Sequence, residues 1–220
     1  MSHGLTFLFD LDGVIVDTTP LHLAAWREYL RRAGVATEYL EEKMHGKRND
    51  ELVRELFGAH LSEQQVFDHG AAKEALFREL AVPRLEEIIV PGLREFLAAH
   101  AAAPKAVGSN AEPANVEFTL KGLGLAHYFS VTVDGHQVER PKPHPDIYLR
   151  AAQLLGRPPG ECVVFEDSLT GVTAARAAGM RVVGVDTARA LAGSPVDLVV
   201  TDFKDPALSE WIRKQPPGMP

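Results

Sequence analysis

The chain of 220 residues carries a formal net charge of −7, is 45% hydrophobic and contains a single cysteine, Cys162. An acidic surface repels nucleic acid and anionic membranes, so we expect neither as a partner. One cysteine allows no intramolecular disulfide. The sequence also lacks an apolar run of about 20 residues and a basic, hydrophobic leader, and these features together favour a cytoplasmic protein. Nothing in the composition demands an oligomer, and we expect a monomer.

Short apolar runs rich in β-branched and aromatic residues predict buried strands. They lie at residues 5–9, 105–108, 129–133, 162–165, 181–185 and 198–200. From residue 105 onward helical patterns alternate with them, at residues 113–123, 145–155 and 169–178. Because alternating strands and helices form parallel sheets with right-handed crossovers, the sequence predicts an α/β fold with a Rossmann-like parallel sheet flanked by helices.

The stretch after the first strand has a different character. It contains no convincing strand, and residues 21–33, 50–57 and 63–80 show the spacing of amphipathic helices. We therefore expect a small helical cap domain, residues 19–86, to be inserted after the first strand. The α/β core would then comprise residues 1–18 and 87–220.

The residues that follow the strands are the candidate site residues, because ligands of open parallel sheets bind beyond the carboxyl ends of the strands. Asp10 and Asp12 follow the first strand, and Gly13 allows a tight turn after them. Two carboxylates at one strand end repel each other, and a cation would relieve that repulsion. Taken alone, the pair could equally be a turn with two solvated aspartates.

Polar residues follow the next three strands as well. Ser109 and Asn110 open a helix, where they could bind an anion or simply cap the helix. Lys142 lies between prolines, which would present its ammonium to a phosphate at low entropic cost. Glu166 and Asp167 could meet the first acid pair around Mg²⁺, which prefers oxygen ligands, or could only complement a helix N-terminus. The occurrence of all four signals in one chain favours a functional site.

These residues and their order resemble the haloacid dehalogenase superfamily. The matching segments are Asp10-Leu-Asp-Gly-Val-Ile-Val-Asp-Thr18, Gly108-Ser-Asn110, Lys142 and Glu166-Asp167-Ser-Leu-Thr-Gly171. The helical insertion is similar to the cap of the β-phosphoglucomutase-like branch, which contains sugar phosphomutases and many small phosphatases. The resemblance spans nearly the whole chain.

The resemblance implies a role for each matching residue. Asp10 would attack phosphorus to form an aspartyl phosphate, and Asp12 would act first as general acid and then as general base. The dehalogenases of the superfamily carry no acid at the position of Asp12, so this residue favours phosphate esters. The cofactor would be Mg²⁺, and the residues expected to hold it are Asp10, Asp12 through its carbonyl, Asp167 and, beside them, Glu166. The residues expected to bind phosphoryl oxygens are Ser109, Asn110 and Lys142.

The cap is expected to select the substrate, and its candidate residues are Thr18, His22, Arg48 and Lys73. His22 resembles the hinge-side histidine of the mutases, but it could instead be a packed histidine. Arg48 and Lys73 resemble the cap cations of mutases. However, the spacing before Arg48 is one residue shorter here, and Lys73 could lie on a solvated helix face.

The loop after Ser109 argues against a mutase. A mutase must hold a bisphosphate at two sites, and in mutases this loop supplies polar and basic groups. Here Glu112 would repel a phosphate, and Pro113 offers no N–H. We therefore expect a Mg²⁺-dependent phosphatase that hydrolyses a small phosphorylated metabolite, a sugar phosphate, with β-phosphoglucomutase activity as the alternative. A catalytically silent binding protein is disfavoured because both aspartates and the lysine are present.

Overall fold

The computed structural model describes residues 4–36, 38–44, 49–186, 191 and 193–215. The chain divides into two compact units. The α/β unit comprises Met1–Asp17 and Glu86–Pro220, and the helical unit comprises Thr18–Leu85. The helical unit is therefore inserted into the α/β unit shortly after its first strand.

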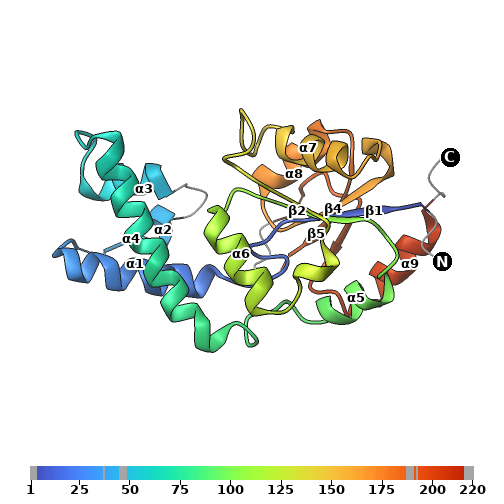
Figure 1. Cartoon of the computed structure of the whole chain (residues 1–220), viewed down its shortest axis with the longest axis horizontal. Helices are drawn as coiled ribbons and strands as arrows, with labels where there is room; N and C mark the ends of the chain where they lie inside the picture. The colour runs from blue at the N-terminus through green and yellow to red at the C-terminus, as the bar shows by residue number, and fades with distance from the viewer. Residues whose placement is uncertain (1–3, 37, 45–48, 187–190, 192, 216–220) are drawn as a thin grey trace. The chain divides into compact units, whose positions relative to one another are not determined.

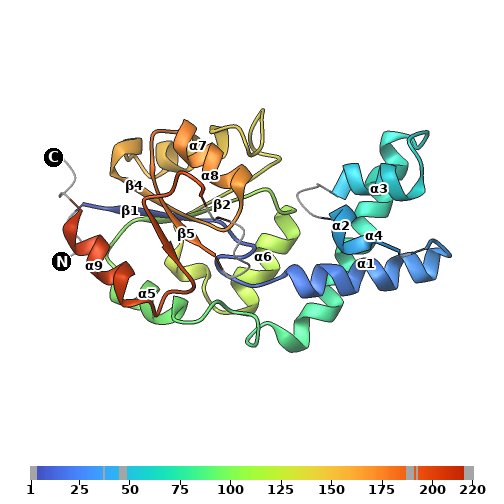
Figure 2. The ribbon, with the colours of Figure 1, turned by 180° about the vertical axis from the view of Figure 1, so that it is seen from behind.

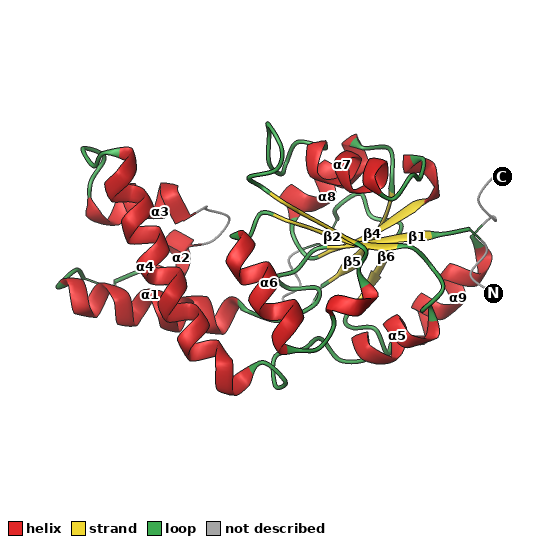
Figure 3. Ribbon diagram, viewed as in Figure 1, coloured by secondary structure: helices red, strands yellow, loops and turns green. Residues whose placement is uncertain are grey.

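Parallel strands form the sheet of the α/β unit. In the part of the chain that the structure describes, the strands are β1 (Thr6–Phe9), β2 (Lys105–Ser109), β3 (Val131–Asp134), β4 (Cys162–Glu166), β5 (Arg181–Val185) and β6 (Leu198–Val200). Their order is β3-β2-β1-β4-β5-β6, and every neighbouring pair is parallel. Figure 3 shows these strands between two groups of helices. The predicted parallel α/β fold is confirmed.

Helices cover both faces of this sheet. Figures 1 and 2 show α7 and α8 on one face and α5, α6 and α9 on the other. Their bounds are α5 (Leu93–Ala99), α6 (Pro113–Gly122), α7 (Asp146–Leu154), α8 (Leu169–Ala177) and α9 (Pro206–Lys214), with short 3-10 turns at Ala126–Tyr128 and Pro159–Glu161. Helices on both faces bury both faces of the sheet, which explains why β1, β2 and β4 are buried along their whole length.

Alternation along β1 sends its side chains into two different clusters. Leu8 belongs to the cluster beneath α7 and α8. Phe7 and Phe9 point to the opposite face, where Phe9 stacks on Phe165 with ring centroids 4.8 Å apart. Phe7 meets Phe96 of α5 edge-on at 5.5 Å, a favourable geometry for aromatic pairs. Both clusters anchor β1, the strand that precedes Asp10.

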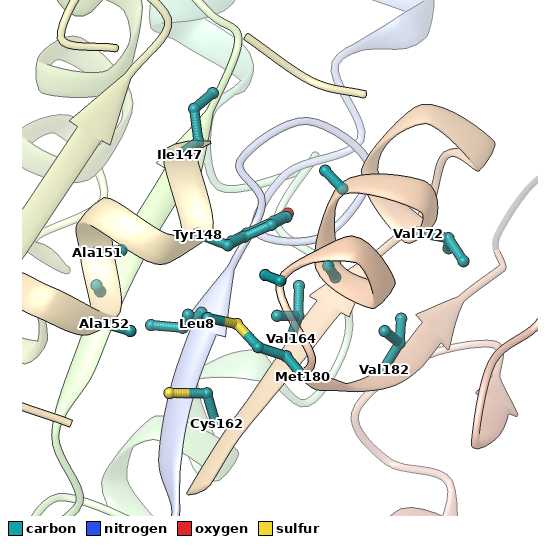
Figure 4. Packing of buried hydrophobic residues seen from close by; sticks show 14 of the residues in the cluster. Leu8, Ile147, Tyr148, Ala151, Ala152, Cys162, Val164, Val172, Met180 and Val182 are labelled. Carbon is teal, nitrogen blue, oxygen red and sulfur yellow. The ribbon is translucent and has the colours of Figure 1, made fainter. Parts of the chain in front are cut away.

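The cluster beneath α7 and α8 is shown in Figure 4. Leu8 and Val164 of the strands lie there together with Met180 and Cys162. Each fully buried side chain of this size stabilises the fold by about 1.5–3 kcal/mol. Burial also raises the pKa of the Cys162 thiol to about 12. This cysteine is therefore a packing residue, as the apolar run around it predicts.

The helical unit contains α1 (Thr19–Ala33), α2 (Leu40–Met44), α3 (Asn49–Phe57), α4 (Glu63–Ala81) and a 3-10 turn at Val82–Arg84. No strand occurs among its described residues. Its helices pack around Trp26 and Leu30. A capping box begins α4, because Gln65 N–H donates to Ser62 Oγ and Ser62 N–H donates to the Gln65 side chain. Across the described residues of both units, each helix is too short or too polar to cross a membrane.

Candidate active site

The carboxyl ends of β1 and β4 meet where the strand order reverses. From β1 the chain continues to β2 and β3 on one side, and then returns to β4, β5 and β6 on the other. Phe9 pairs with Phe165, and the Asp10 N–H donates to Phe165 O at 3.0 Å. The residues that follow these two phenylalanines, Asp10 and Glu166, are therefore brought side by side. This reversal point is where open parallel sheets bind ligands.

Gly13 shapes the turn after β1 and also admits Asp167. Its φ is +77°, a left-handed conformation that favours glycine, and its N–H donates to Val16 O at 2.8 Å. A Cβ at this position would lie 1.9 Å from Asp167 Oδ2. A side chain here would therefore strain the turn and displace Asp167. Asp12 lies in the same turn, half-buried.

The backbone of Lys142 is held by Asn110. The Lys142 N–H donates to Asn110 Oδ1 at 3.1 Å, and Asn110 Nδ2 donates to the Lys142 carbonyl at 3.3 Å. The Lys142–Pro143 peptide bond that follows is cis. The sequence suggests a phosphate-binding role for Asn110, whereas its side chain lies against the loop that carries Lys142. It therefore ties the loop after β3 to the end of β2.

The ammonium of Lys142 lies between two carboxylates. Its Nζ is 2.9 Å from Asp10 Oδ1 and 2.6 Å from Glu166 Oε1. Burial alone would lower the pKa of Lys142, but the charges of Asp10 and Glu166 raise it above its ordinary value. The lysine is therefore a fixed cation beside Asp10 at neutral pH.

Carboxylates crowd this end of the sheet. Burial raises the pKa of Asp10 to about 7, with the Lys142 charge opposing and the Glu166 charge adding to the rise. Burial raises the pKa of Asp167 to about 9, and the charges of Asp10 and Glu166 add to it. One ammonium does not offset the charge of this many buried acids, so the site favours a further cation.

The donor set fits a hard divalent cation. One carboxylate oxygen from each of Asp10, Glu166 and Asp167 lies within 4.8 Å of the other two. Asp10 Oδ1 is buried, and among the described residues it accepts no hydrogen bond; its contact with Lys142 is an ion pair without hydrogen-bond geometry. Carboxylate oxygens are the ligands that Mg²⁺ prefers, and Asp10 Oδ1 has no donor of its own among the described residues. The residues present therefore fit magnesium.

Ser109 ends β2, and Glu112 lies in the loop that follows. Ser109 is buried, and its Oγ accepts the N–H of Ala111 at 3.0 Å, so its hydroxyl hydrogen can point to another acceptor. Glu112 lies just before α6, and its carboxylate is 3.1 Å from His136 Nε2. His136 is exposed and Glu112 is half-buried. The loop thus presents an acid where a mutase is expected to present cations.

In the helical unit, Lys73 is buried, which overturns the alternative of a solvated helix face. Its ammonium donates to His22 Nδ1 at 2.7 Å and to Glu74 Oε1 at 2.8 Å. The His22 ring stacks on Phe77 with centroids 3.9 Å apart. Thr18 is also buried. The structure therefore brings Lys73 and His22 together, whereas Arg48 lies outside the described residues.

Two residues that the sequence analysis missed contact Glu166. The Tyr148 hydroxyl donates to Glu166 Oε1 at 2.7 Å. A Cβ at Gly171 would lie 1.7 Å from the same oxygen, so only glycine leaves room for this carboxylate. Gly171 lies within the motif that carries the resemblance, but that motif does not reveal the contact. In the sequence, a tyrosine on the apolar face of a predicted helix indicates a buried hydroxyl that needs a hydrogen-bond partner, and this pattern could have identified Tyr148.

Known proteins similar to this chain include sugar-phosphate enzymes. The family model for haloacid dehalogenase-like hydrolases matches residues 5–179. Fructose-1-phosphate phosphatase YqaB of Escherichia coli is 36% identical over 182 residues, which cover 81% of this chain and 94% of the relative. Hexitol phosphatase A of Escherichia coli is 37% identical over 221 residues, 96% and 95% of the two chains. The crystal structure of β-phosphoglucomutase from Clostridium difficile superposes with a TM-score of 0.81 at 26% identity, covering 97% of this chain and 98% of that one.

Proposed function

The chain belongs to the family of haloacid dehalogenase-like hydrolases, and we propose that it is a Mg²⁺-dependent phosphatase of a small sugar phosphate. Two relatives that cover most of its length are named for phosphatase activity on fructose 1-phosphate and on hexitol phosphates. The observation that carries the proposal is the buried Asp10 Oδ1, an acceptor without a hydrogen bond among the described residues, beside the Lys142 ammonium.

Asp10 is the nucleophile in this proposal. A carboxylate oxygen of Asp10 attacks phosphorus, the bond from phosphorus to the ester oxygen breaks, and an aspartyl phosphate forms. Asp12 donates its proton to the leaving ester oxygen, so that the sugar departs as a neutral alcohol. Lys142 and the Ser109 hydroxyl bind the non-bridging phosphoryl oxygens, so that the Asp10 oxygen and the leaving oxygen lie in line through phosphorus. Positioning and charge neutralisation account for most of the catalysis, because the transferred group is compact and highly charged.

Water completes the reaction. Asp12, now a carboxylate, takes a proton from a water molecule as its oxygen attacks phosphorus. The bond from phosphorus to the Asp10 oxygen breaks, releasing inorganic phosphate and restoring the Asp10 carboxylate. Asp12 ends the cycle protonated, as it began. Each half-reaction therefore moves one proton through the same side chain.

Magnesium would be held by the Asp10 and Asp167 carboxylates and the Asp12 carbonyl, with Glu166 beside them. When bound, it supplies Lewis-acid charge neutralisation to the phosphoryl oxygens. Without added positive charge, the Asp10 carboxylate would repel an incoming phosphate dianion. The Lys142 ammonium offsets part of this repulsion from the protein side.

The Glu112 carboxylate supports a phosphatase over a mutase. A mutase intermediate carries two phosphates, so one of them must lie away from the nucleophile. Glu112 follows Ser109 by three residues, and its carboxylate would repel a phosphate beside it. A sugar or polyol with hydroxyl groups there meets no such repulsion. We therefore place water, and not a sugar phosphate, as the acceptor of the phosphoryl group.

A substrate panel tests the proposal. The protein is incubated with Mg²⁺ and fructose 1-phosphate, hexitol phosphates, or β-glucose 1-phosphate with a bisphosphate primer, and both free phosphate and isomerised sugar are measured. We expect phosphate release that disappears with EDTA and in Asp10→Asn, whereas Asp68→Asn, at an exposed position of α4, retains it. Isomer without phosphate release would establish a mutase instead. Tight binding with neither product would point to a non-catalytic protein.

A further inference from the structure

Tyr148 is a buried polar residue that the mechanism above does not use. It lies on α7, six residues after Lys142, and its side chain is fully buried. Figure 4 shows its ring among the apolar side chains beneath α7 and α8, with the hydroxyl at the far end of the ring. A buried hydroxyl needs a hydrogen-bond partner, and here the partner is Glu166 Oε1 at 2.7 Å. A phenylalanine would fill the same apolar space, so packing alone does not require the hydroxyl.

The Glu166 carboxylate is saturated with hydrogen bonds. Its Oε1 accepts from Lys142 Nζ at 2.6 Å and from the Tyr148 hydroxyl at 2.7 Å. Its Oε2 accepts from the backbone N–H groups of Asp167 and Ser168 at 3.0 and 3.1 Å and from the Ser168 hydroxyl at 3.0 Å. A carboxylate offers about four lone-pair sites, and five donors occupy them. The carboxylate therefore has one orientation, in which Oε1 faces Lys142.

Tyr148 also contacts Lys142 directly. The Lys142 ammonium lies 4.8 Å from the centroid of the Tyr148 ring, within the range of a cation–π interaction. The hydroxyl and the ring thus act on the same cation, one through Glu166 and the other through the ring face. An ammonium has three N–H groups. Glu166 accepts one of them, which leaves the others for further acceptors such as a phosphoryl oxygen.

We infer that Tyr148 is a positioning residue for phosphate binding by Lys142, and that it acts by holding Glu166 Oε1 in place. The inference rests on the proposed function, in which Lys142 binds the transferred phosphoryl group. Without the tyrosine hydroxyl, Lys142 is the only donor left to Glu166 Oε1. The Lys142 and Glu166 side chains can then move from their present positions. The ammonium then points less directly at the phosphoryl site.

Phosphate binding in paired backgrounds tests the inference. The dissociation constant of inorganic phosphate is measured by calorimetry, in the presence of Mg²⁺, for wild type, Tyr148→Phe, Lys142→Met and the double variant. We expect Tyr148→Phe to weaken phosphate binding and lower kcat by about tenfold, because hydrogen bonds to charged groups have effects of that order. KM for the substrate should change less than kcat. In the Lys142→Met background, Tyr148→Phe should change phosphate binding by less than about twofold, since the lysine through which it acts is missing.

Tyr29→Phe is the matched control. Tyr29 also shares a side-chain hydrogen bond, at 2.7 Å with His69 Nδ1, but it lies in the helical unit and has no part in the proposed mechanism. We expect wild-type phosphate binding and kcat from it. Thermal unfolding of each variant shows whether the protein is folded. A loss caused by poor folding would persist in the Lys142→Met background, whereas a loss through Lys142 would not.

The outcomes separate the inference from the proposed function. A wild-type protein that hydrolyses phosphate esters, with Tyr148→Phe indistinguishable from it, would overturn the inference alone. Equal effects of Tyr148→Phe with and without Lys142 would also overturn it, because the hydroxyl would then act by another route. A wild-type protein that neither binds phosphate nor hydrolyses any ester of the panel would overturn the proposed function and the inference together.

Discussion

A single methyl group at position 171 should disrupt the candidate site. An alanine Cβ there would lie 1.7 Å from Glu166 Oε1 and 1.9 Å from its carboxyl carbon, whereas real contacts essentially never fall below 3.0 Å. The Glu166 carboxyl group must therefore move by about 1 Å or more. It is fully buried, and its oxygens accept hydrogen bonds from five donors. Moving it breaks a buried charge pair with Lys142.

The size of the effect follows from two opposing terms. Breaking a buried ion pair costs about 3–5 kcal/mol, and replacing a helical glycine by alanine returns about 1 kcal/mol. We therefore expect Gly171→Ala to lower the free energy of unfolding by about 2–4 kcal/mol. For a chain of this length that is a fall in Tm of roughly 4–16 °C.

Gly70→Ala is the matched control for this prediction. Gly70 also lies within a helix, but a Cβ there would meet no atom within 4 Å. Helix propensity alone should leave its Tm unchanged or raise it by a few degrees, roughly 2–4 °C. Thermal unfolding by circular dichroism compares the two variants. If Gly171→Ala is as stable as Gly70→Ala, the close contact between position 171 and the Glu166 carboxylate is refuted.

Three further predictions concern His100, Cys162 and Asn110. Burial holds the pKa of His100 below its ordinary value of 6.5, so the unfolded chain binds the proton more readily and stability should fall as pH drops below about 6.5. Between about pH 7 and pH 5, Tm should fall less in His100→Gln than in the wild-type protein. An equal fall in Tm for the two proteins would contradict this. Burial raises the pKa of the Cys162 thiol to about 12, so at pH 8 the thiol should react with an aromatic disulfide only after unfolding. Prompt reaction of the native protein would contradict the burial of Cys162. Asn110→Ala removes both hydrogen bonds to the Lys142 backbone and should lower kcat by about tenfold, while Tm falls only modestly. An unchanged kcat would show that these two hydrogen bonds do not matter for catalysis.

The sequence predicts the strands well but misses short helices. The strands at residues 181–185 and 198–200 occur as expected, because continuous apolar runs bounded by turn residues favour buried parallel strands. The third strand begins at Val131 and not at residue 129, since Phe129 closes the 3-10 turn Ala126–Tyr128. Helices α2, α5 and α9 were not expected. Helices α2 and α5 have 5 and 7 residues, too few for a clear helical period.

The sequence predicts which strand ends carry the candidate site, but not the contacts that its residues make. Asp10 and Glu166 meet because topology aligns the ends of β1 and β4, and the alternation of strands and helices indicates that topology. The position of Asn110 on the Lys142 backbone depends on how two loops fold against each other, which spacing does not reveal. The burial of Lys73 likewise depends on a neighbouring acid and a histidine 51 residues away.

The most direct test of the account is to locate the transferred phosphoryl group. The protein is mixed with Mg²⁺ and its best substrate from the panel, quenched in acid within the first turnover, digested and analysed by mass spectrometry. We expect one phosphoryl group on the peptide that contains Asp10, formed only with Mg²⁺ and absent in Asp10→Asn. Phosphate release at the wild-type rate by Asp10→Asn, or a phosphoryl group on another residue, would contradict the claim that Asp10 is the nucleophile.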